Sequence, residues 1–417
     1  MEGEIFVVTG PGQGHLNPCM ELCKHLASRN YQTTLVVPST ASFAIPSSFT
    51  QNTSTRIVHV AGSSGPSMPG PDPFRDKSGQ DLEAHLANRS KDSARPLCAI
   101  IDFQMGWTKR VFWKFHIPFI GFFTFGACAA AMEMGAWKVQ AGDIKPGEIR
   151  SVSGLPEDMA LEHLDTKRRP EGPPRDHPHA SGPDGPKGGG GPPKPGDRPP
   201  WVPEIEDQEH TRQSNYNEDD VIQWLDSKPR GSVLYVAFGS EVGPSKEEYP
   251  QLTMALEEST RPFIWVIQPG SGIPGSTESK VGERGLIICG WAPQLLILSH
   301  PSTGGFLSHC GWNSTVEAIC RGVPLLEWPF RGDQYYNAKW VVKHLKVGHR
   351  VAEDPSEMVR KDDIRGGIEK VMVDVEIKKM AGALRGKLEN GFPASSEAAL
   401  DAFGHFISQR KALYTTK

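Results

Sequence analysis

The chain has 417 residues, more than one hydrophobic core usually serves, so we expect two domains. Its 45 Lys and Arg residues nearly balance its 49 Asp and Glu residues, which argues against a protein that binds nucleic acid. No apolar run approaches the roughly 18 residues of a membrane-spanning helix, and the acidic start is unlike a signal peptide. Seven scattered cysteines indicate reduced thiols, so the sequence predicts a cytoplasmic protein without stable membrane insertion.

The first third of the chain alternates strand-like and helix-like segments. A short apolar strand is expected at residues 5–8, a glycine-containing turn at 10–14, a helix at 16–26 and strands at 33–37, 97–102 and 119–122. This βαβ order predicts a parallel sheet flanked by helices.

A tract rich in proline and glycine interrupts this order. Between Pro170 and Pro203, 12 residues are Pro and 8 are Gly, so 20 of the 34 residues are of these two types. Such a composition cannot form a packed element and predicts an exposed loop.

The α/β order resumes after the tract. Strands are expected at residues 232–238, 263–267, 286–289, 305–308 and 324–326, and helices at 247–258, 361–373, 376–388 and 395–407. We therefore predict two doubly wound α/β domains facing a cleft, with ligands beyond the carboxyl ends of the strands. The N-terminal domain would cover residues 1–205, a linker 206–230 and the C-terminal domain 231–417.

The stretch from Trp291 to Gln334 has residues suited to a nucleotide. Part of it runs from a strand through a glycine-containing turn into a helix start, where Asn313 or Ser314 can cap unpaired N–H groups. Such a helix end is an anion site that suits a diphosphate. His309, just before it, can add a hydrogen bond.

Two further residues extend this site. Glu317 lies on the same helix face as Asn313 and can accept hydrogen bonds from paired sugar hydroxyls, and Trp291 can present its indole face to a planar base. Taken singly, these residues have plainer interpretations, because a Trp after a strand is usually core and a Ser at a helix start is usually only a cap.

Together the residues of this stretch resemble the plant secondary product glycosyltransferase box, the signature of plant family-1 UDP-glycosyltransferases. The segment from Trp291 to Gln334 has the full 44-residue length of that box without a gap. The resemblance extends to Gly12-Gln-Gly-His15, to Asp102 followed by Trp107, and to the strand-like run that ends at Ser240.

The resemblance implies a GT-B fold and an inverting mechanism. His15 would be the general base that takes the acceptor proton, and Asp102 would hold its ring, roles that fit a His near neutral pH beside a carboxylate. On the residues alone, His15 is better explained as a loop histidine capping a helix that begins at Leu16.

The resemblance also assigns the donor side. Trp291 would stack on uracil, and the Ala292 backbone would read the base edge. The remaining contacts would be to the ribose from Gln294 and Glu317, to the phosphates from Ser240, His309, Asn313 and Ser314, and to the sugar from Trp312, Asp333 and Gln334. A Gln at the last position is common in members that use UDP-glucose. No Asp-x-Asp pair occurs, so we expect no metal and no cofactor beyond the donor substrate.

The acceptor would be a small apolar molecule, phenolic such as a flavonoid, or terpenoid, and the enzyme a monomer that O-glucosylates it. Aromatic residues that could line its pocket, although each also fits a plain core position, are Phe103, Trp107, Phe122, Phe123 and Phe125.

Three alternatives remain open on the sequence. One is C-glucosylation of an electron-rich ring with the same His15. Another is a non-catalytic UDP-sugar binder, because the chain is short after the Pro/Gly tract and leaves no room there for two strands, whose loss would leave a sheet edge unpaired. A dinucleotide oxidoreductase is the weakest, since His15 stands where the GxGxxG pattern needs Gly.

Overall fold

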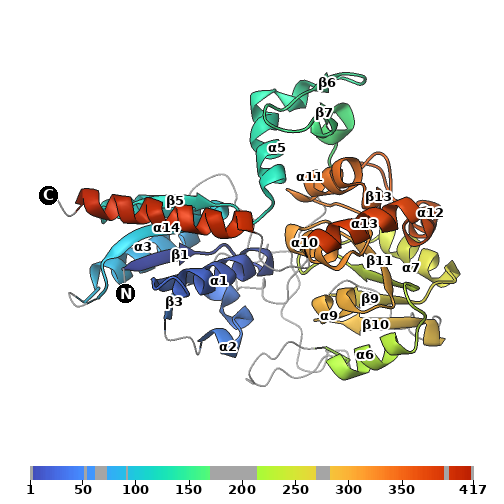
Figure 1. Ribbon diagram of the computed structural model, residues 1–417, viewed down its shortest axis with the longest axis horizontal. Helices are drawn as coiled ribbons and strands as arrows, with labels where there is room; N and C mark the ends of the chain where they lie inside the picture. The colour runs from blue at the N-terminus through green and yellow to red at the C-terminus, as the bar shows by residue number, and fades with distance from the viewer. Residues whose placement is uncertain are drawn as a thin grey trace, which may run out of the picture.

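The computed structural model describes residues 3–50, 54–61, 73–90, 93–169, 214–268, 282–388 and 394–414. Two α/β bodies lie side by side, each built on its own parallel sheet (Figure 1). The expected loop at Pro170–Pro203 and residues 206–213 of the expected linker lie outside the described residues, whereas residues 214–230 of that linker are described.

The N-terminal body is a five-stranded parallel sheet in the order β3-β2-β1-β4-β5. Its strands are β1 (Glu4–Val8), β2 (Gln32–Pro38), β3 (Thr55–Val60), β4 (Pro96–Asp102) and β5 (Phe119–Phe122). Its main helices are α1 (Gln13–Ala27), α3 (Pro73–Ala87) and α4 (Lys109–Lys114), with a short α2 (Ser47–Thr50).

Every residue of β1 is buried because side chains of both faces pack against helices. Ile5 and Val7 join one apolar cluster with α1, while Phe6 and Val8 join another with α3 and α4. The opposite directions follow from the two-residue period of a strand. Among the described residues β5 lies at one edge of this sheet and β3 at the other.

The C-terminal body is a six-stranded parallel sheet in the order β10-β9-β8-β11-β12-β13. Its strands are β8 (Val233–Ala237), β9 (Phe263–Ile267), β10 (Gly285–Cys289), β11 (Thr303–Ser308), β12 (Leu325–Glu327) and β13 (Gly348–Arg350). Its helices are α6 (Glu218–Asp226), α7 (Glu248–Glu258), α9 (Gln294–Ser299), α10 (Trp312–Arg321), α11 (Gln334–Lys339), the π-helix η7 (Trp340–Leu345), α12 (Lys361–Val373) and α13 (Val375–Leu388). The strands expected from the sequence are confirmed within two residues at each end.

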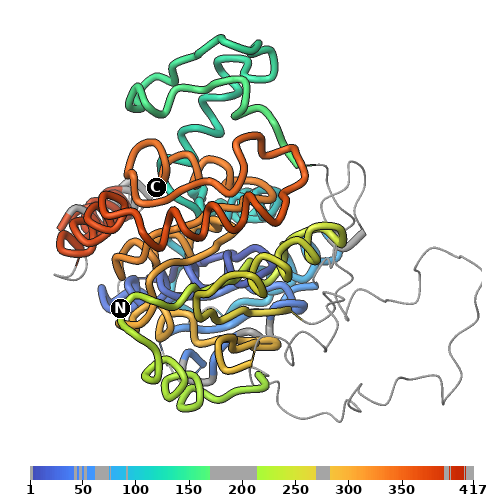
Figure 2. Tube along the Cα trace, turned by 90° about the vertical axis from the view of Figure 1, so that its right-hand side faces the viewer, coloured from blue at the N-terminus to red at the C-terminus, as the bar shows by residue number. Residues whose placement is uncertain are grey.

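A small unit from the expected N-terminal domain of residues 1–205 packs against the C-terminal body. It comprises α5 (Ala127–Lys138), η3 (Ala141–Asp143), β6 (Ile149–Arg150), β7 (Leu161–Glu162) and η5 (His163–Thr166). Its apolar cluster includes Tyr336 and Trp340 of the C-terminal body. Asp165 also accepts a hydrogen bond from Lys339, which is only 2% exposed, and this buried ion pair fixes the unit there. The backbone of the unit lies next to that of the C-terminal body (Figure 2).

The last helix, α14 (Ala394–Tyr414), comes from the second half of the chain but packs against the N-terminal body. This helix falls in the expected C-terminal domain of residues 231–417 and lies across the N-terminal body (Figure 1). Ile407 is buried in the cluster around β1 and α1, and Arg29 pairs with Asp401 at 3.3 Å. Burial of Ile407 therefore ties the end of the chain to its beginning.

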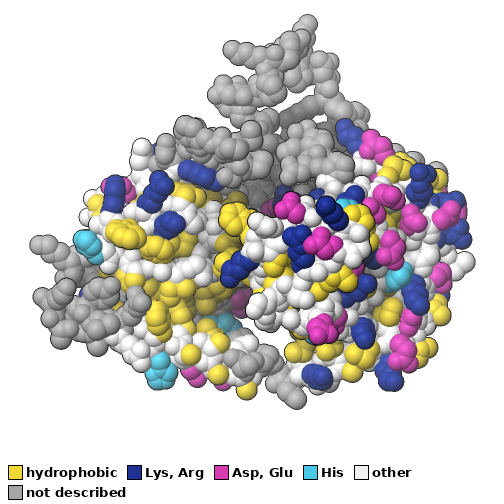
Figure 3. Space-filling model, turned by 90° about the horizontal axis from the view of Figure 1, so that it is seen from above, with side chains coloured by type: hydrophobic (Ala, Val, Ile, Leu, Met, Phe, Trp, Pro, Cys, Tyr) yellow, Lys and Arg dark blue, Asp and Glu magenta, His cyan; other side chains and the backbone are white. Residues whose placement is uncertain are grey.

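The surface of the two bodies differs in character. Seen from above, hydrophobic side chains gather on the left-hand N-terminal body, whereas Lys, Arg, Asp and Glu side chains intermingle over the right-hand C-terminal body (Figure 3). Within the described ranges, no helix combines the length and the apolar character needed to cross a bilayer.

Candidate functional site

His15 and Asp102 meet at the carboxyl ends of β1 and β4. The His15 Nδ1 lies 2.8 Å from the Asp102 Oδ2, and the His15 ring is 17% exposed, whereas Asp102 is fully buried. The Thr124 hydroxyl, which no motif of the sequence indicates, lies 2.9 Å from the same ring nitrogen. With Nδ1 held by this pair, Nε2 is the nitrogen left to exchange protons.

Local backbone geometry produces this arrangement. Gly12 has a φ of 90°, which favours glycine, and it precedes the first turn of α1, which contains His15. His15 therefore lies inside the helix and does not cap a helix that begins at Leu16. The second oxygen of Asp102 accepts a hydrogen bond from the Gln104 N–H at 2.9 Å, which fixes the carboxylate.

An aromatic cluster adjoins His15. The ring of Phe103 lies 5.8 Å from the His15 ring, 5.7 Å from Phe123 and 5.0 Å from Phe125, between centroids. Phe103 and Phe123 are 40% and 42% exposed, so the cluster offers apolar surface beside the base.

The other two aromatic residues expected at the acceptor pocket lie elsewhere. Trp107 packs in the core cluster with α3 and α4, and Phe122 packs in the cluster on the α1 face. They are core residues, because their positions in the chain place them on buried faces of the sheet.

On the C-terminal body, Gln294 links the residues expected at the ribose. Its amide nitrogen donates to Glu317 at 2.7 Å and to Ser314 at 3.0 Å, and its oxygen accepts from the Tyr235 hydroxyl at 3.2 Å. Burial raises the pKa of Glu317. Half-buried Trp291 and Ala292 lie on the loop between β10 and α9.

The start of α10 differs from the sequence expectation. The helix begins at Trp312 with Gly311 as its N-cap, so neither Asn313 nor Ser314 caps it. Both residues lie in its first turn because the helix starts two residues earlier than a cap at Asn313 requires. The unpaired N–H groups of this turn remain suited to an anion.

His309 lies beside this helix start. Its ring is buried, its Nδ1 has no partner within the described ranges, and burial lowers its pKa to about 4. A Cβ atom at Gly239 or Gly311 would crowd the His309 Nε2, so glycines on both sides make room for the ring. Ser240, which follows Gly239, is exposed.

The residues expected at the sugar lie where the two bodies meet. Asp333 accepts from Asn337 at 2.7 Å; burial raises its pKa, and the charge of His15 opposes that shift. Gln334 accepts through Oε1 from the N–H groups of Phe330 at 2.9 Å and Arg331 at 3.1 Å, which leaves its Nε2 as a donor.

Trp312 and Glu241 also bridge the bodies. The Trp312 ring contacts Gly126, just before α5, and lies 5.8 Å from the Trp340 ring. Glu241 pairs with Arg331 and lies against Gly12, beside His15. These contacts bring together, where the two bodies meet, the segments that carry His15, Asp102, Trp312 and Asp333.

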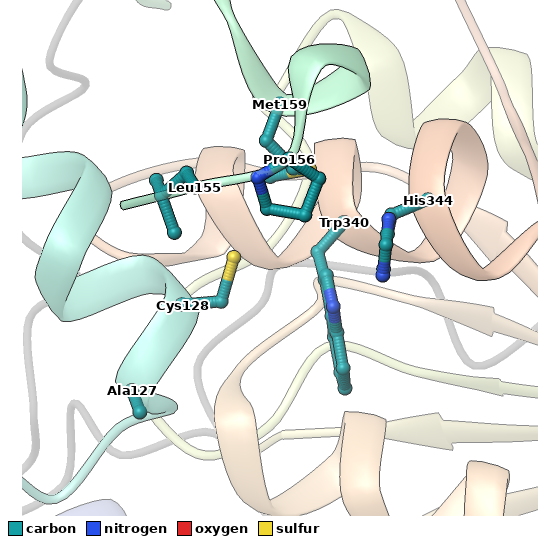
Figure 4. Close-up of a pocket in the computed structure, with 7 residues that line it drawn as sticks. All are labelled: Ala127, Cys128, Leu155, Pro156, Met159, Trp340 and His344. Carbon is teal, nitrogen blue, oxygen red and sulfur yellow. The ribbon is translucent and has the colours of Figure 1, made fainter. Parts of the chain in front are cut away.

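A cavity of about 280 Å³ lies where the small unit meets the C-terminal body (Figure 4). It is lined by Ala127, Cys128, Leu155, Pro156, Met159, Trp340 and His344. The sequence carries no signal for this cavity, because its lining residues come from distant segments that share no pattern. No group of three or more His, Cys, Asp or Glu residues that could hold a metal occurs in the part of the chain that the structure describes.

Sequence comparisons identify relatives of the C-terminal half. A family model described as UDP-glucoronosyl and UDP-glucosyl transferase matches residues 200–385. UDP-glycosyltransferase 73C5 of Arabidopsis thaliana is 44% identical over 192 residues, which cover 44% of this chain and 38% of that protein. UDP-glycosyltransferase 73C3 of the same plant is 46% identical over 179 residues, covering 41% and 35%. The match therefore spans well under half the length of these curated relatives.

Solved structures match over almost the whole chain. UGT2 of Phytolacca americana, complexed with UDP-2fluoro-glucose and pterostilbene, has a TM-score of 0.72 at 23% identity, covering 98% of this chain and 99% of that one. TcCGT1 in complex with UDP has a TM-score of 0.73 at 21% identity, covering 98% and 100%. At such identities the likeness shows the fold, and the expected GT-B architecture is confirmed. Residues 200–385 thus match the UDP-glucoronosyl and UDP-glucosyl transferase family model, and the chain is similar to plant UDP-glycosyltransferases over less than half of its length.

Proposed function

We propose that the protein transfers glucose from UDP-glucose to a hydroxyl of a small apolar acceptor, with inversion at the anomeric carbon. One observation carries the proposal: the His15–Asp102 pair lies beside Gly12, which touches Glu241 of the other body, and Glu241 pairs with Arg331, two residues before Asp333. A base on one side and a sugar-binding carboxylate on the other is the arrangement that this transfer needs.

His15 would act as the base. Its Nε2 takes the proton of the acceptor hydroxyl while Nδ1–H donates to Asp102, which holds the tautomer and stabilises the imidazolium. The acceptor oxygen forms a bond to the anomeric carbon on the face opposite UDP. The bond from that carbon to the diphosphate oxygen breaks, and UDP leaves with the electron pair.

The donor would lie along the edge of the C-terminal sheet. Trp291 and Ala292 would hold uracil, and the linked pair of Gln294 and Glu317 would hold the ribose. Ser240, Asn313, Ser314 and neutral His309 at the start of α10 would stabilise the charge of the leaving diphosphate. Trp312, Asp333 and Gln334 would contact the sugar, and no metal is needed in this scheme.

The acceptor would lie against Phe103, Phe123 and Phe125, whose exposed faces adjoin His15. This supports a flat, apolar acceptor such as a phenol or flavonoid, or a terpenoid. Pterostilbene bound to the Phytolacca americana protein and indoxyl glucosylated by a Polygonum tinctorium protein are aromatic molecules of this kind. Seven free cysteines support a reaction that takes place in the cytoplasm. We also expect the protein to be a monomer.

Three measurements test the proposal. Mass spectrometry of the full chain with UDP-glucose and a panel of phenolic and terpenoid acceptors should show a product heavier by one hexose. Acid hydrolysis separates O-glucosides, which release glucose, from C-glucosides, which resist it. If no product forms but calorimetry shows UDP-glucose binding, the chain is a non-catalytic binder; absence of binding overturns the donor assignment as well.

A further inference from the structure

Residues 165–169 form a strap by which the first half of the chain attaches to the C-terminal body. Within it, the Arg169 guanidinium pairs with Glu248, and the two side chains are 12% and 1% exposed. Glu248 is itself fixed, because it accepts from the N–H groups of Val359 and Ser245, each at 3.0 Å. Arg169 is therefore held in one place by a buried carboxylate.

Arg169 also contacts the loop of residues 328–334. Its guanidinium lies over the rings of Phe330 at 5.4 Å and Trp328 at 6.0 Å, distances that suit a cation–π interaction. Its backbone N–H donates to the Tyr335 hydroxyl at 3.0 Å, and that hydroxyl donates to the Phe330 carbonyl at 2.7 Å. Both the ring and the carbonyl of Phe330 are thus held through Arg169.

Phe330 is in turn coupled to Gln334. The Gln334 Oε1 accepts from the Phe330 N–H at 2.9 Å and from the Arg331 N–H at 3.1 Å. Any shift of Phe330 therefore displaces the amide of Gln334 or leaves a backbone N–H without its acceptor.

We propose that Arg169 is a positioning residue that sets the place of Gln334 at the sugar end of the donor site without touching the donor. The inference rests on the proposed function, in which Gln334 contacts glucose. A guanidinium suits the task because its planar face stacks on Phe330 while its edge pairs with Glu248, whereas a lysine keeps only the charge.

Calorimetric titration of the full chain with UDP and with UDP-glucose tests this role. Arg169→Ala should raise the Kd of UDP-glucose about 10-fold and leave the Kd of UDP within about 2-fold, because only the sugar contact is displaced. Tyr335→Phe should act in the same direction, since it removes the hydroxyl between Arg169 and Phe330. Arg169→Lys should restore part of the loss.

Arg261→Ala is the matched control, because it breaks an ion pair with Glu369 on the same body; it should change neither Kd. Equal weakening of UDP and UDP-glucose in Arg169→Ala would mark a merely structural residue and overturn the inference. If Arg169→Ala fails to fold, unchanged UDP-glucose binding in both Tyr335→Phe and Arg169→Lys overturns it. A wild-type chain that does not bind UDP-glucose contradicts the proposed function instead.

Discussion

His15 owes its fixed orientation to groups from three segments: the start of α1, the end of β4 and the residue Thr124 beyond β5. The carboxylate of Asp102 is buried and anchored by a backbone N–H, so it has little freedom to turn away. A ring held in this way needs no reorganisation when it accepts a proton, which is the advantage of a preorganised base.

Substituting His15→Ala should reduce transfer to a hydroxyl acceptor by about 10²- to 10⁴-fold, the usual contribution of a positioned base. UDP binding should stay unchanged, because the donor contacts lie on the other body. Steady-state kinetics and UDP titration measure the two effects. His25→Ala, at the far end of the same helix, is the control. Retained turnover in His15→Ala would sink the assignment of the base.

Gln334→His should weaken the use of UDP-glucose. The change removes the oxygen that accepts from two backbone N–H groups, and each lost partner costs about 1–3 kcal/mol where the group stays buried. We expect kcat/KM for UDP-glucose to fall relative to that for other UDP-sugars. An unchanged donor preference would count against a sugar-contacting Gln334.

His309 should make stability depend on pH. Its pKa falls from 6.5 to about 4 on burial, so between these values the unfolded chain binds a proton that the folded chain excludes. The free energy of unfolding should therefore drop as the pH falls from 6.5 to 4, by up to about 3 kcal/mol from this group. Denaturant titrations at several pH values should show this drop in the wild type and a smaller one in His309→Asn; equal drops contradict it.

At this scale the sequence indicates candidate residues but not the contacts that hold them. His15, Asp102 and Gln294 stand in recognisable motifs, so their importance could be read from the chain. Thr124 and Arg169 could not, because a single Thr after a strand and an Arg beside a Pro/Gly tract have no pattern of their own. The cap predicted at Asn313 or Ser314 is wrong because Gly311, two residues before Asn313, is the N-cap.

At the scale of elements, the strands expected from apolar runs of the sequence lie close to strands of the structure, whereas β3 and β13 were not expected. Buried parallel strands are short and continuously apolar, which makes them easy to find. The position of α14 was not predictable in this way. A helix pattern shows which face is apolar, but it does not show which of two bodies that face will cover.

Ile407 tests the attachment of α14 to the N-terminal body. It is buried among residues of β1 and α1, so Ile407→Ala should lower the free energy of unfolding by about 2–4 kcal/mol. His405→Ala, exposed on the same helix, should have little effect. Urea denaturation measures both. Equal stability of the two variants would show that α14 does not contribute to that core.

At the scale of the whole molecule, the exchange of elements decides which fragments can fold. The C-terminal body buries Lys339, Tyr336 and Trp340 against the small unit that begins after Gly126. A fragment of residues 214–388 would expose them, including a lysine stripped of its carboxylate partner. A fragment of residues 126–388 retains that cover.

We therefore expect residues 126–388 to give a monodisperse fragment with cooperative unfolding, and residues 214–388 to aggregate or unfold without a transition. Size-exclusion chromatography and thermal circular dichroism distinguish the two. Lys339→Met should improve the shorter fragment, since it removes the unpaired charge. Equal behaviour of both fragments would contradict the role given to the small unit.

The strap at Arg169 also bears on how the chain tolerates changes in length. Arg169 is anchored to Glu248, and the next described residues, Ser214 and Asn215, are anchored to Gly290 and Cys289 of the same body. Arg169 and Ser214 are thus both attached to the C-terminal body. Because the two attachment points lie on the same body, a change in the number of residues between them should not displace that body relative to His15. This stretch is the natural place to graft a reporter domain without disturbing the site.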